Sequence, residues 1–327
     1  MPLSIKTIDI SRVEDANARA DVIAQMMDSS RSIGFFCLTG TRIPVALIKD
    51  MHNSLRQIFA IDDAQKSRQA ITRTNYRGYI PMALFRANGT DHHADQYEGY
   101  KLHYDVSEQD PIRADCDLYG PNLWPDHCPE VRETILNYWG HLDDLTHLLL
   151  SLLEEGLHLE RGSMTDAMVL PLTNMTLLHY PKRPDGAEPS GIHPHKDTDI
   201  LTIIAPDPVG GLEVRTPDGR WIEPDCPDGG VIVNIGDMLE VWSGGRLVST
   251  PHRVINRSGR ERYSFPYFAV PRHDVVITPL LQPLDGFDRP AVHCGHWSRE
   301  VWRTNWPDET PEGDTPELGT ITDALDA

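Results

Sequence analysis

Residues 191–204 read GIHPHKDTDILTII, a polar segment with two histidines and two aspartates that leads directly into an apolar, β-branched run. Similar short apolar runs occur between about residues 172 and 275, and turn sequences such as PDGR and SGGR separate them. The runs are TLLHY, LTIIAP, GGLEVRT, RWIEP, GVIVNIGD, MLEVWSGG, PHRVIN and RYSFPYFAVP. Many short strands at close spacing predict a β-sandwich or jelly roll.

The rest of the chain is predicted to add helices around this core. Apolar residues at helical spacing occur over about residues 10–70, where GFFCLTG interrupts them as a short strand, and over residues 129–156. Residues 72–110 are polar and irregular, which indicates loops and short strands. We expect a mainly β fold with flanking helices and a single domain over 1–327. It comprises a mostly helical region (1–165), a jelly-roll core (172–275), and a C-terminal helix with an acidic tail (276–327).

Composition narrows the classes of partner. The 327-residue chain has a formal net charge of −19, and an acidic surface repels the phosphates of nucleic acids. No segment is apolar enough for a signal peptide or a transmembrane helix, so we expect neither nucleic acid nor membrane as a partner. The five cysteines are scattered without a CxxC pair. This argues against a thiolate zinc site and favours a reducing, cytoplasmic location.

His195-Lys196-Asp197 has the form His-x-Asp, which on a strand places both side chains on one face, where they can share a metal ion. The pattern alone is weak, because it occurs three more times, at His93/Asp95, His103/Asp105 and His141/Asp143. The first of these lies in a polar loop, and the second has no suitably spaced downstream partner. The third lies in a predicted helix, where such residues diverge by about 200°.

A third candidate ligand, His252 in STPHRVIN, follows His195 by 57 residues. Two neutral imidazoles and one carboxylate form the facial triad of non-haem Fe(II) enzymes, which leaves coordination positions open for reactants. We therefore expect His195, Asp197 and His252 to be metal ligands.

Arg262 and Ser264, in RERYSFPYF, would share one face of a strand. A guanidinium group binds a carboxylate through two N–H groups, and a nearby hydroxyl adds a third hydrogen bond. Taken alone, Arg262 would be read as part of an ion pair on a sheet surface. Its position after the three candidate ligands favours a carboxylate-binding site instead.

In this order and spacing, the motifs resemble those of the Fe(II)- and 2-oxoglutarate-dependent dioxygenases of the isopenicillin N synthase-like family. The motifs are HPHKDTDILTII, GGLEVRTPDGRWIEP, GVIVNIGDMLEVWSGGRLVSTPHRVIN and RERYSFPYFAVP. The resemblance is dense over about residues 172–275 and looser near the N-terminus. It implies a double-stranded β-helix, or jelly roll, with helices packed outside.

The resemblance also implies roles for single residues. His195, Asp197 and His252 match the iron ligands of the family, and Arg262 and Ser264 match the pair that holds the distal carboxylate of 2-oxoglutarate.

Two positions near the co-substrate are less clear. Tyr180, in LLHYP, matches a tyrosine that reaches 2-oxoglutarate in the family, although a core tyrosine is an equal interpretation. Two residues earlier the family usually has Asn, and here Leu178 replaces it. One polar contact to the co-substrate or the iron shell is therefore missing.

Other residues near the expected site keep alternative interpretations. His193 would share the inward face with His195, either as a substrate contact or as a hydrogen-bonded histidine on the barrel rim. The glycines at 210, 211 and 236 are expected in turns.

The substrate pocket is expected between residues of about 75–105 and a C-terminal helix, HWSREVWRTNW. Candidate contacts are Tyr76, Arg77, Phe85 and Arg86.

The implied cofactors are Fe(II), 2-oxoglutarate as co-substrate, and O₂. The implied reaction releases succinate and CO₂ while a small molecule is hydroxylated, desaturated or cyclised, and a secondary metabolite or an amino-acid-derived compound fits the family. The alternatives are a 2-oxoglutarate-independent oxidase of the isopenicillin N synthase type, an ethylene-forming reaction, and a non-catalytic jelly-roll binding module.

Overall fold

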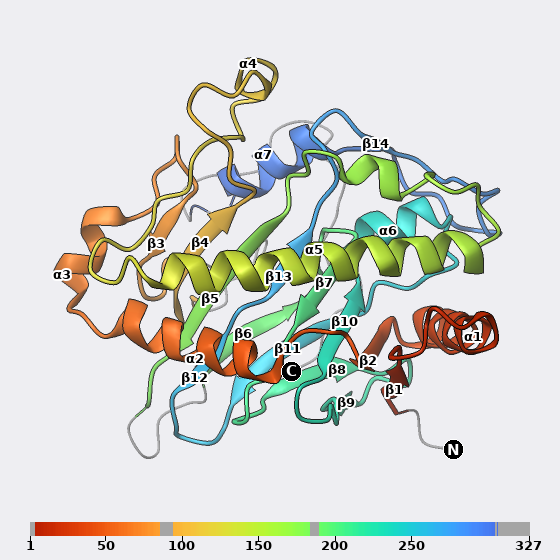
Figure 1. Ribbon diagram of the computed structural model, residues 1–327, viewed down its shortest axis with the longest axis horizontal. Coiled ribbons are helices and arrows are strands. Elements are labelled where there is room, and N and C mark those ends of the chain that lie inside the picture. Colours follow the sequence, from red (N-terminus) through yellow and green to blue (C-terminus); the bar gives the residue numbers. More distant parts are fainter. Residues whose placement is uncertain (1–3, 86–93, 184–189, 305, 307–327) are drawn as a thin grey trace.

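The larger β-sheet draws its strands from the N-terminal region as well as from the predicted core (Figure 1). The computed structural model describes residues 4–85, 94–183, 190–304 and 306. The strands of this sheet are β1 (Lys6–Asp9), β2 (Phe35–Thr39), β3 (Gly78–Ile80), β4 (Glu98–His103), β5 (Asn174–Tyr180), β7 (Leu201–Ile204), β10 (Val231–Ile235), β12 (Arg262–Ser264) and β13 (Tyr267–Ala269). They lie in the order β1-β2-β10-β7-β13-β5-β4-β3, and β12 also pairs with β5.

A smaller antiparallel sheet lies against the inner face of the larger one. It contains β6 (Ser190–His195), β8 (Leu212–Arg215), β9 (Trp221–Ile222) and β11 (His252–Asn256), in the order β6-β11-β8-β9. Leu178 and Tyr180 of β5 form one buried apolar cluster with Val254 of β11, so the two sheets face each other. A further pair of strands, β14 (Val276–Ile277) and β15 (Val292–His293), precedes the C-terminal helix α7 (Cys294–Thr304).

Helices cover the outer face of the larger sheet. Figure 1 shows α5 (Val131–Gly156) crossing the sheet, with α2 (Val45–Phe59) beside it and α1 (Ala16–Ser32) at one end. The predicted helix over 129–156 is confirmed, and its buried leucines at helical spacing pack on the sheet. Three shorter helices are α3 (Asp63–Lys66), α4 (Ile112–Asp115) and α6 (Asp237–Trp242). No helix in the described ranges is both long enough and apolar enough to cross a bilayer.

Alternation along β5 decides which side chains reach the space between the sheets. Met175 and Leu177 join the core beneath the helices, whereas Leu178 and Tyr180 turn toward the smaller sheet. Their partners across β12 are Ser264 and Arg262, which therefore share this inner face.

The predicted strands from residue 172 onward are confirmed except for MLEVWSGG, which is largely the helix α6. The backbone N–H groups of Asp237 and Met238, at its start, donate to the carbonyls of Asp197 and Asp199. A side chain on Gly236 would collide with Asp199, because its Cβ would lie 2.2 Å from the Asp199 carbonyl oxygen. The helix thus depends on contacts with a distant loop, which local periodicity does not reveal.

Candidate functional site

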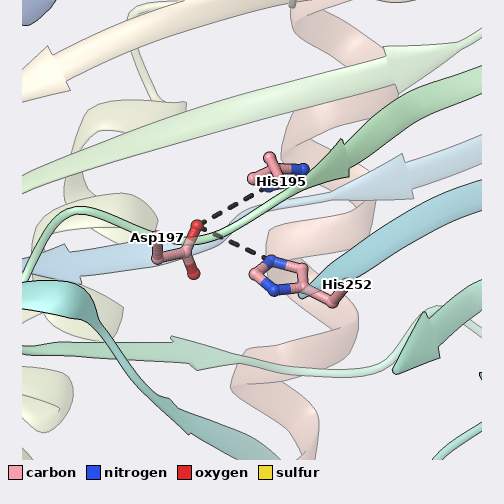
Figure 2. A group of neighbouring side chains, drawn as sticks. All are labelled: His195, Asp197 and His252. Carbon is pink, nitrogen blue, oxygen red and sulfur yellow. Dashed lines mark ion pairs between the residues drawn. The ribbon is translucent and has the colours of Figure 1, made fainter. Parts of the chain in front are cut away.

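His195 and His252 are brought together by strand pairing (Figure 2). His195 is the last residue of β6 and His252 is the first residue of β11, and the two are directly paired. Asp197 lies two residues beyond β6, and its Oδ1 is 3.6 Å from Nε2 of each imidazole. One ligand atom from each of the three residues lies within 4.8 Å of the others. The predicted triad therefore assembles, although Asp197 is not on the strand itself.

Backbone carbonyls orient both imidazole rings. Nδ1 of His195 lies 2.8 Å from the carbonyl oxygen of His193, and Nδ1 of His252 lies 3.2 Å from that of Thr250. A protonated Nδ1 donates in both cases, which leaves the Nε2 lone pair facing Asp197. Such hydrogen bonds select the tautomer in metal-binding histidines.

Two polar side chains hold the Asp197 carboxylate from the opposite side. Oδ2 of Asp197 accepts from the Thr202 hydroxyl at 2.5 Å and from the Asn234 amide at 2.9 Å. Thr202 Oγ1 also lies 2.9 Å from Asp199 Oδ2. Burial and the charge of Asp197 raise the pKa of Asp199 well above its usual range. A protonated Asp199 can therefore donate to Thr202 while Thr202 donates to Asp197.

The electrostatics favour the protonation states that a cation requires. Burial would raise the pKa of Asp197, but the two imidazoles and the hydrogen bonds from Thr202 and Asn234 together lower it. Burial lowers the pKa of His252 to about 4. One carboxylate beside two neutral imidazoles is the donor set of a non-haem iron site.

The other His-x-Asp pairs do not form comparable sites. His93 lies outside the described residues. Nε2 of His103 lies 3.0 Å from the Tyr76 carbonyl oxygen, and Asp143, on α5, accepts from the Tyr267 hydroxyl. Within the described ranges, no His, Cys, Asp or Glu residues other than the triad form a cluster that could hold a metal.

Arg262 is buried without a carboxylate partner in the described part of the chain. Its Nε donates to the carbonyl oxygen of Gly210 at 2.8 Å, and its Nη1 has no hydrogen-bond partner. The guanidinium carbon lies 4.8 Å from the ring centroid of Tyr180, whose hydroxyl is also buried and unpartnered. The carbonyl of Gly210 therefore helps to hold Arg262 in place. The φ of Gly210 is +77°, which favours glycine, as expected in a turn. Two orphaned buried donors beside one another suit a ligand carboxylate.

Comparisons with known proteins agree with this geometry. Residues 172–271 match the family model of the 2OG-Fe(II) oxygenase superfamily. Residues 5–127 match a second family model, which is described as "non-haem dioxygenase in morphine synthesis N-terminal". The 2-oxoglutarate-dependent dioxygenase thnC of Trichoderma harzianum is 31% identical over 293 residues, which cover 86% of this chain and 89% of that protein. The chain belongs to the Fe(II)- and 2-oxoglutarate-dependent oxygenases.

Two further similarities support the family assignment. Feruloyl CoA ortho-hydroxylase 2 of Arabidopsis thaliana is 29% identical, with 88% of this chain and 75% of that protein covered. The solved structure of a 2OG-Fe(II) oxygenase family protein from Caulobacter crescentus has a TM-score of 0.79 and 28% identity, with 91% of this chain and 98% of that one covered.

These findings confirm the predicted jelly-roll class and the enzyme class. Oxygenases of this family use Fe(II), 2-oxoglutarate and O₂, and the relatives act on small molecules. The 2-oxoglutarate-dependent reaction is supported over the oxidase, ethylene-forming and non-catalytic alternatives.

In this oxygenase, His193 is hydrogen-bonded to Asp95. Its Nδ1 and its backbone nitrogen lie 2.8 and 3.0 Å from Asp95 Oδ1. The hydrogen bond to Asp95 raises the pKa of His193. The Asp95 of the rejected His-x-Asp pair therefore orients the strand that carries His195.

The residues considered for substrate contact are largely packed together. Tyr76 and Phe85 are buried in one cluster, and Tyr76 stacks on Trp302 of α7 with ring centroids 5.0 Å apart. Arg77 donates to the Leu118 carbonyl at 2.7 Å. Arg86 lies outside the described residues. The predicted helix over 296–306 corresponds to α7, and its contacts link it to residues 76–85.

From the sequence alone, Thr202 and Asn234 are predicted only as members of apolar strands, without a role in the site. A polar residue inside each of LTII and VIVNI was the available signal, because a buried polar group needs a partner. Their partner is Asp197, which only the sheet pairing reveals.

Proposed function

We propose that His195, Asp197 and His252 hold the catalytic Fe(II) of this oxygenase. The observation that carries this proposal is the donor set itself: two imidazole Nε2 atoms face one carboxylate oxygen, and each side chain is fixed by a further hydrogen bond. Bound Fe(II) supplies the redox chemistry that couples O₂ reduction to decarboxylation of 2-oxoglutarate and oxidation of the substrate. The task of the protein is to position these groups and limit the access of water.

Arg262, Ser264 and Tyr180 are proposed to bind the distal carboxylate of 2-oxoglutarate. The free Nη1 of Arg262 and the free hydroxyl of Tyr180 offer two donors, and buried Ser264 lies two residues along the same strand face. A carboxylate bound here would neutralise a buried guanidinium that has no carboxylate partner among the described residues. This compensation gives the pocket its preference for a dicarboxylate over a neutral ligand.

Leu178 is proposed to change the contacts of the co-substrate. It is paired with Ser264 and packs against Tyr180 and Val254, so it presents a hydrocarbon surface where the family usually has an amide. The distal carboxylate of 2-oxoglutarate would then be bound by Arg262, Ser264 and Tyr180.

The substrate is proposed to be a small secondary metabolite or an amino-acid-derived compound, oxidised by hydroxylation, desaturation or cyclisation. The name of one relative, a hydroxylase of feruloyl-CoA, supports the oxidation of a small molecule. We also propose that residues 1–327 form a single oxygenase domain, since β1 to β4 of the N-terminal region pair within the same sheet as the core strands. A cytoplasmic location stays a prediction from composition.

Oxygen uptake and succinate release test this function. The purified protein is assayed with Fe(II), with and without 2-oxoglutarate, against a metabolite library. We expect uptake and succinate only when 2-oxoglutarate is present. Substrate-dependent uptake without 2-oxoglutarate would instead establish an oxidase.

A further inference from the structure

A row of paired residues on the inner face of the larger sheet leads away from the candidate iron site. The register places in this row Asn234, Thr202, Phe268, Asn174 and His103, in spatial order. Thr202 and Asn234 are the two residues that donate to Asp197. The row therefore runs from a proposed metal ligand across β10, β7, β13 and β5 to β4.

Lys101 of β4 reaches into this row. Its Nζ donates to Asn174 Oδ1 at 2.6 Å and to Thr176 Oγ1 at 2.8 Å, and it lies 5.3 Å from the ring centroid of Phe268. Two strand spacings separate β7 from β5, which amounts to about 10 Å. The ammonium group is thus within reach of a small molecule whose other end lies at the triad.

The surroundings of Lys101 leave its charge without an ion-pair partner in the described part of the chain. Its direct contacts there are two neutral oxygens and an aromatic ring, and the carboxyl of Asp199 acts on it only at longer range, without forming an ion pair. Burial lowers the pKa of Lys101 to about 7. Yet Lys101, Asn174 and Phe268 all keep some accessible surface. The register places these side chains on the inner face of the larger sheet, which faces the smaller sheet.

Lys66 shows how the same fold treats a lysine with a structural role. Its ammonium belongs to a buried side chain, bonds to Glu98 and lies 2.9 Å from Asp63 Oδ1. Two carboxylates therefore offset its desolvation. Lys101 has no such ion pair, so a purely structural role does not explain its charge.

We propose that Lys101, with Asn174 and Thr176, binds a carboxylate group of the primary substrate, so that this substrate is a small organic acid. The proposal rests on the proposed function, because it takes the triad as the place of oxidation. The oxidised carbon would lie several bonds from the carboxylate, since about 10 Å separates the two ends of the site. Arg262 already provides a separate cation for 2-oxoglutarate.

Calorimetric binding of matched probes tests the proposal without requiring turnover. The full-length protein, loaded with Mn(II) and 2-oxoglutarate, is titrated with straight-chain acids from butyrate to dodecanoate and with phenylacetate, 3-phenylpropionate and cinnamate. Each acid is compared with its primary amide, which has the same shape without the charge. We expect the best acid to bind about 30-fold more tightly than its amide.

The variants assign this preference to one residue. Lys101→Met should bring acid and amide to within about threefold of each other, and Lys101→Arg should keep part of the preference. Lys49→Met, at an exposed lysine on α2, should match the wild type. Lys101→Met should also melt at the same temperature as the wild type or at a higher one, because it removes a charge that has no ion-pair partner. If the methionine variant does not fold, Lys101→Gln is used in its place.

Three results would overturn the proposal. The first is an acid preference that persists in Lys101→Met, and the second is a wild-type protein in which no acid exceeds its amide. The third is a Lys101→Met variant that binds 2-oxoglutarate more weakly but binds the probe acids as the wild type does. That result would place Lys101 in the co-substrate site. Failure of the wild type to bind Mn(II) and 2-oxoglutarate would instead contradict the proposed function.

Discussion

The guanidinium of Arg262 lies over the ring of Tyr180, with its central carbon 4.8 Å from the ring centroid, because the two residues are directly paired across β12 and β5. The same pairing leaves a guanidinium nitrogen and a phenol oxygen buried without partners. Burial raises the pKa of Tyr180 to about 12, so the phenol remains a donor at neutral pH. Two paired strands thus place two buried donors next to each other.

Arg262→Ala should weaken 2-oxoglutarate binding by about two to three orders of magnitude, because loss of one member of a buried ion pair costs about 3–5 kcal/mol. Arg262→Lys should recover only part of the lost affinity, because an ammonium group cannot offer the two parallel N–H donors of a planar guanidinium group. Titration of the Mn(II)-loaded protein measures both, with exposed Arg220→Ala as the control. Normal 2-oxoglutarate affinity combined with lost substrate affinity would make Arg262 a substrate residue.

Asn234→Ala and Thr202→Val should each lower metal affinity about 10- to 100-fold, as expected when a hydrogen bond to a metal-binding side chain is removed. Each variant removes one of the two hydrogen bonds to Oδ2 of Asp197, so the carboxylate is held less firmly toward the imidazoles. Competition with a fluorescent chelator measures the affinity. Unchanged affinity in both variants would show that Asp197 is oriented by the metal alone.

Leu178→Asn should destabilise the free protein by about 1–3 kcal/mol, because an amide would replace an apolar side chain within the cluster of Leu178, Tyr180 and Val254. The same amide, beside Ser264, should tighten 2-oxoglutarate binding by about 1 kcal/mol, or about fivefold. Chemical denaturation and calorimetry measure the two effects. A variant with weaker 2-oxoglutarate binding would mean that Leu178 does not occupy the position of the family amide.

Glu98→Gln should destabilise the protein by about 3–5 kcal/mol at pH 7, because Glu98 is buried and bonds to Lys66, to the Tyr79 hydroxyl and to Nδ1 of His179. Burial would raise the pKa of Glu98, but these hydrogen bonds together lower it. A depressed carboxyl pKa stabilises the fold above the unfolded value of 4.5. That stability is lost as pH falls through the folded value.

Denaturation of the wild type and Glu98→Gln at pH 4 and pH 7 measures this contribution. The difference between the two proteins should narrow at the lower pH. If the difference in unfolding free energy between the two proteins were the same at pH 4 and pH 7, the charge on Glu98 would contribute nothing to stability.

The grouping of His195, Asp197 and His252, and the shared strand of Arg262 and Ser264, could be predicted because these residues stand in short motifs whose alternation and order are local properties of the chain. Arg262 and Ser264, two residues apart on one strand, needed no knowledge of the sheet order. The single error among the predicted core strands, α6, arose because its first N–H groups bond to the distant loop at Asp197 and Asp199.

The supporting residues could not be predicted for a related reason. A polar residue in an apolar strand shows its purpose only when the neighbouring strand is known. Lys101 meets Asn174 and Thr176 through pairing of β4 with β5, more than 70 residues along the chain, and its sequence EGYKLHYD carries no motif that singles out the lysine. The rejected pair at Asp95 orients His193 through a contact 98 residues away.

The most direct test is a crystal structure of the protein soaked anaerobically with Fe(II) and 2-oxoglutarate, with anomalous scattering recorded at the iron edge. The account predicts one iron peak bonded to Nε2 of His195, Nε2 of His252 and Oδ1 of Asp197, with the distal carboxylate of 2-oxoglutarate on Arg262. An iron peak elsewhere, or no peak between these three side chains, would contradict it.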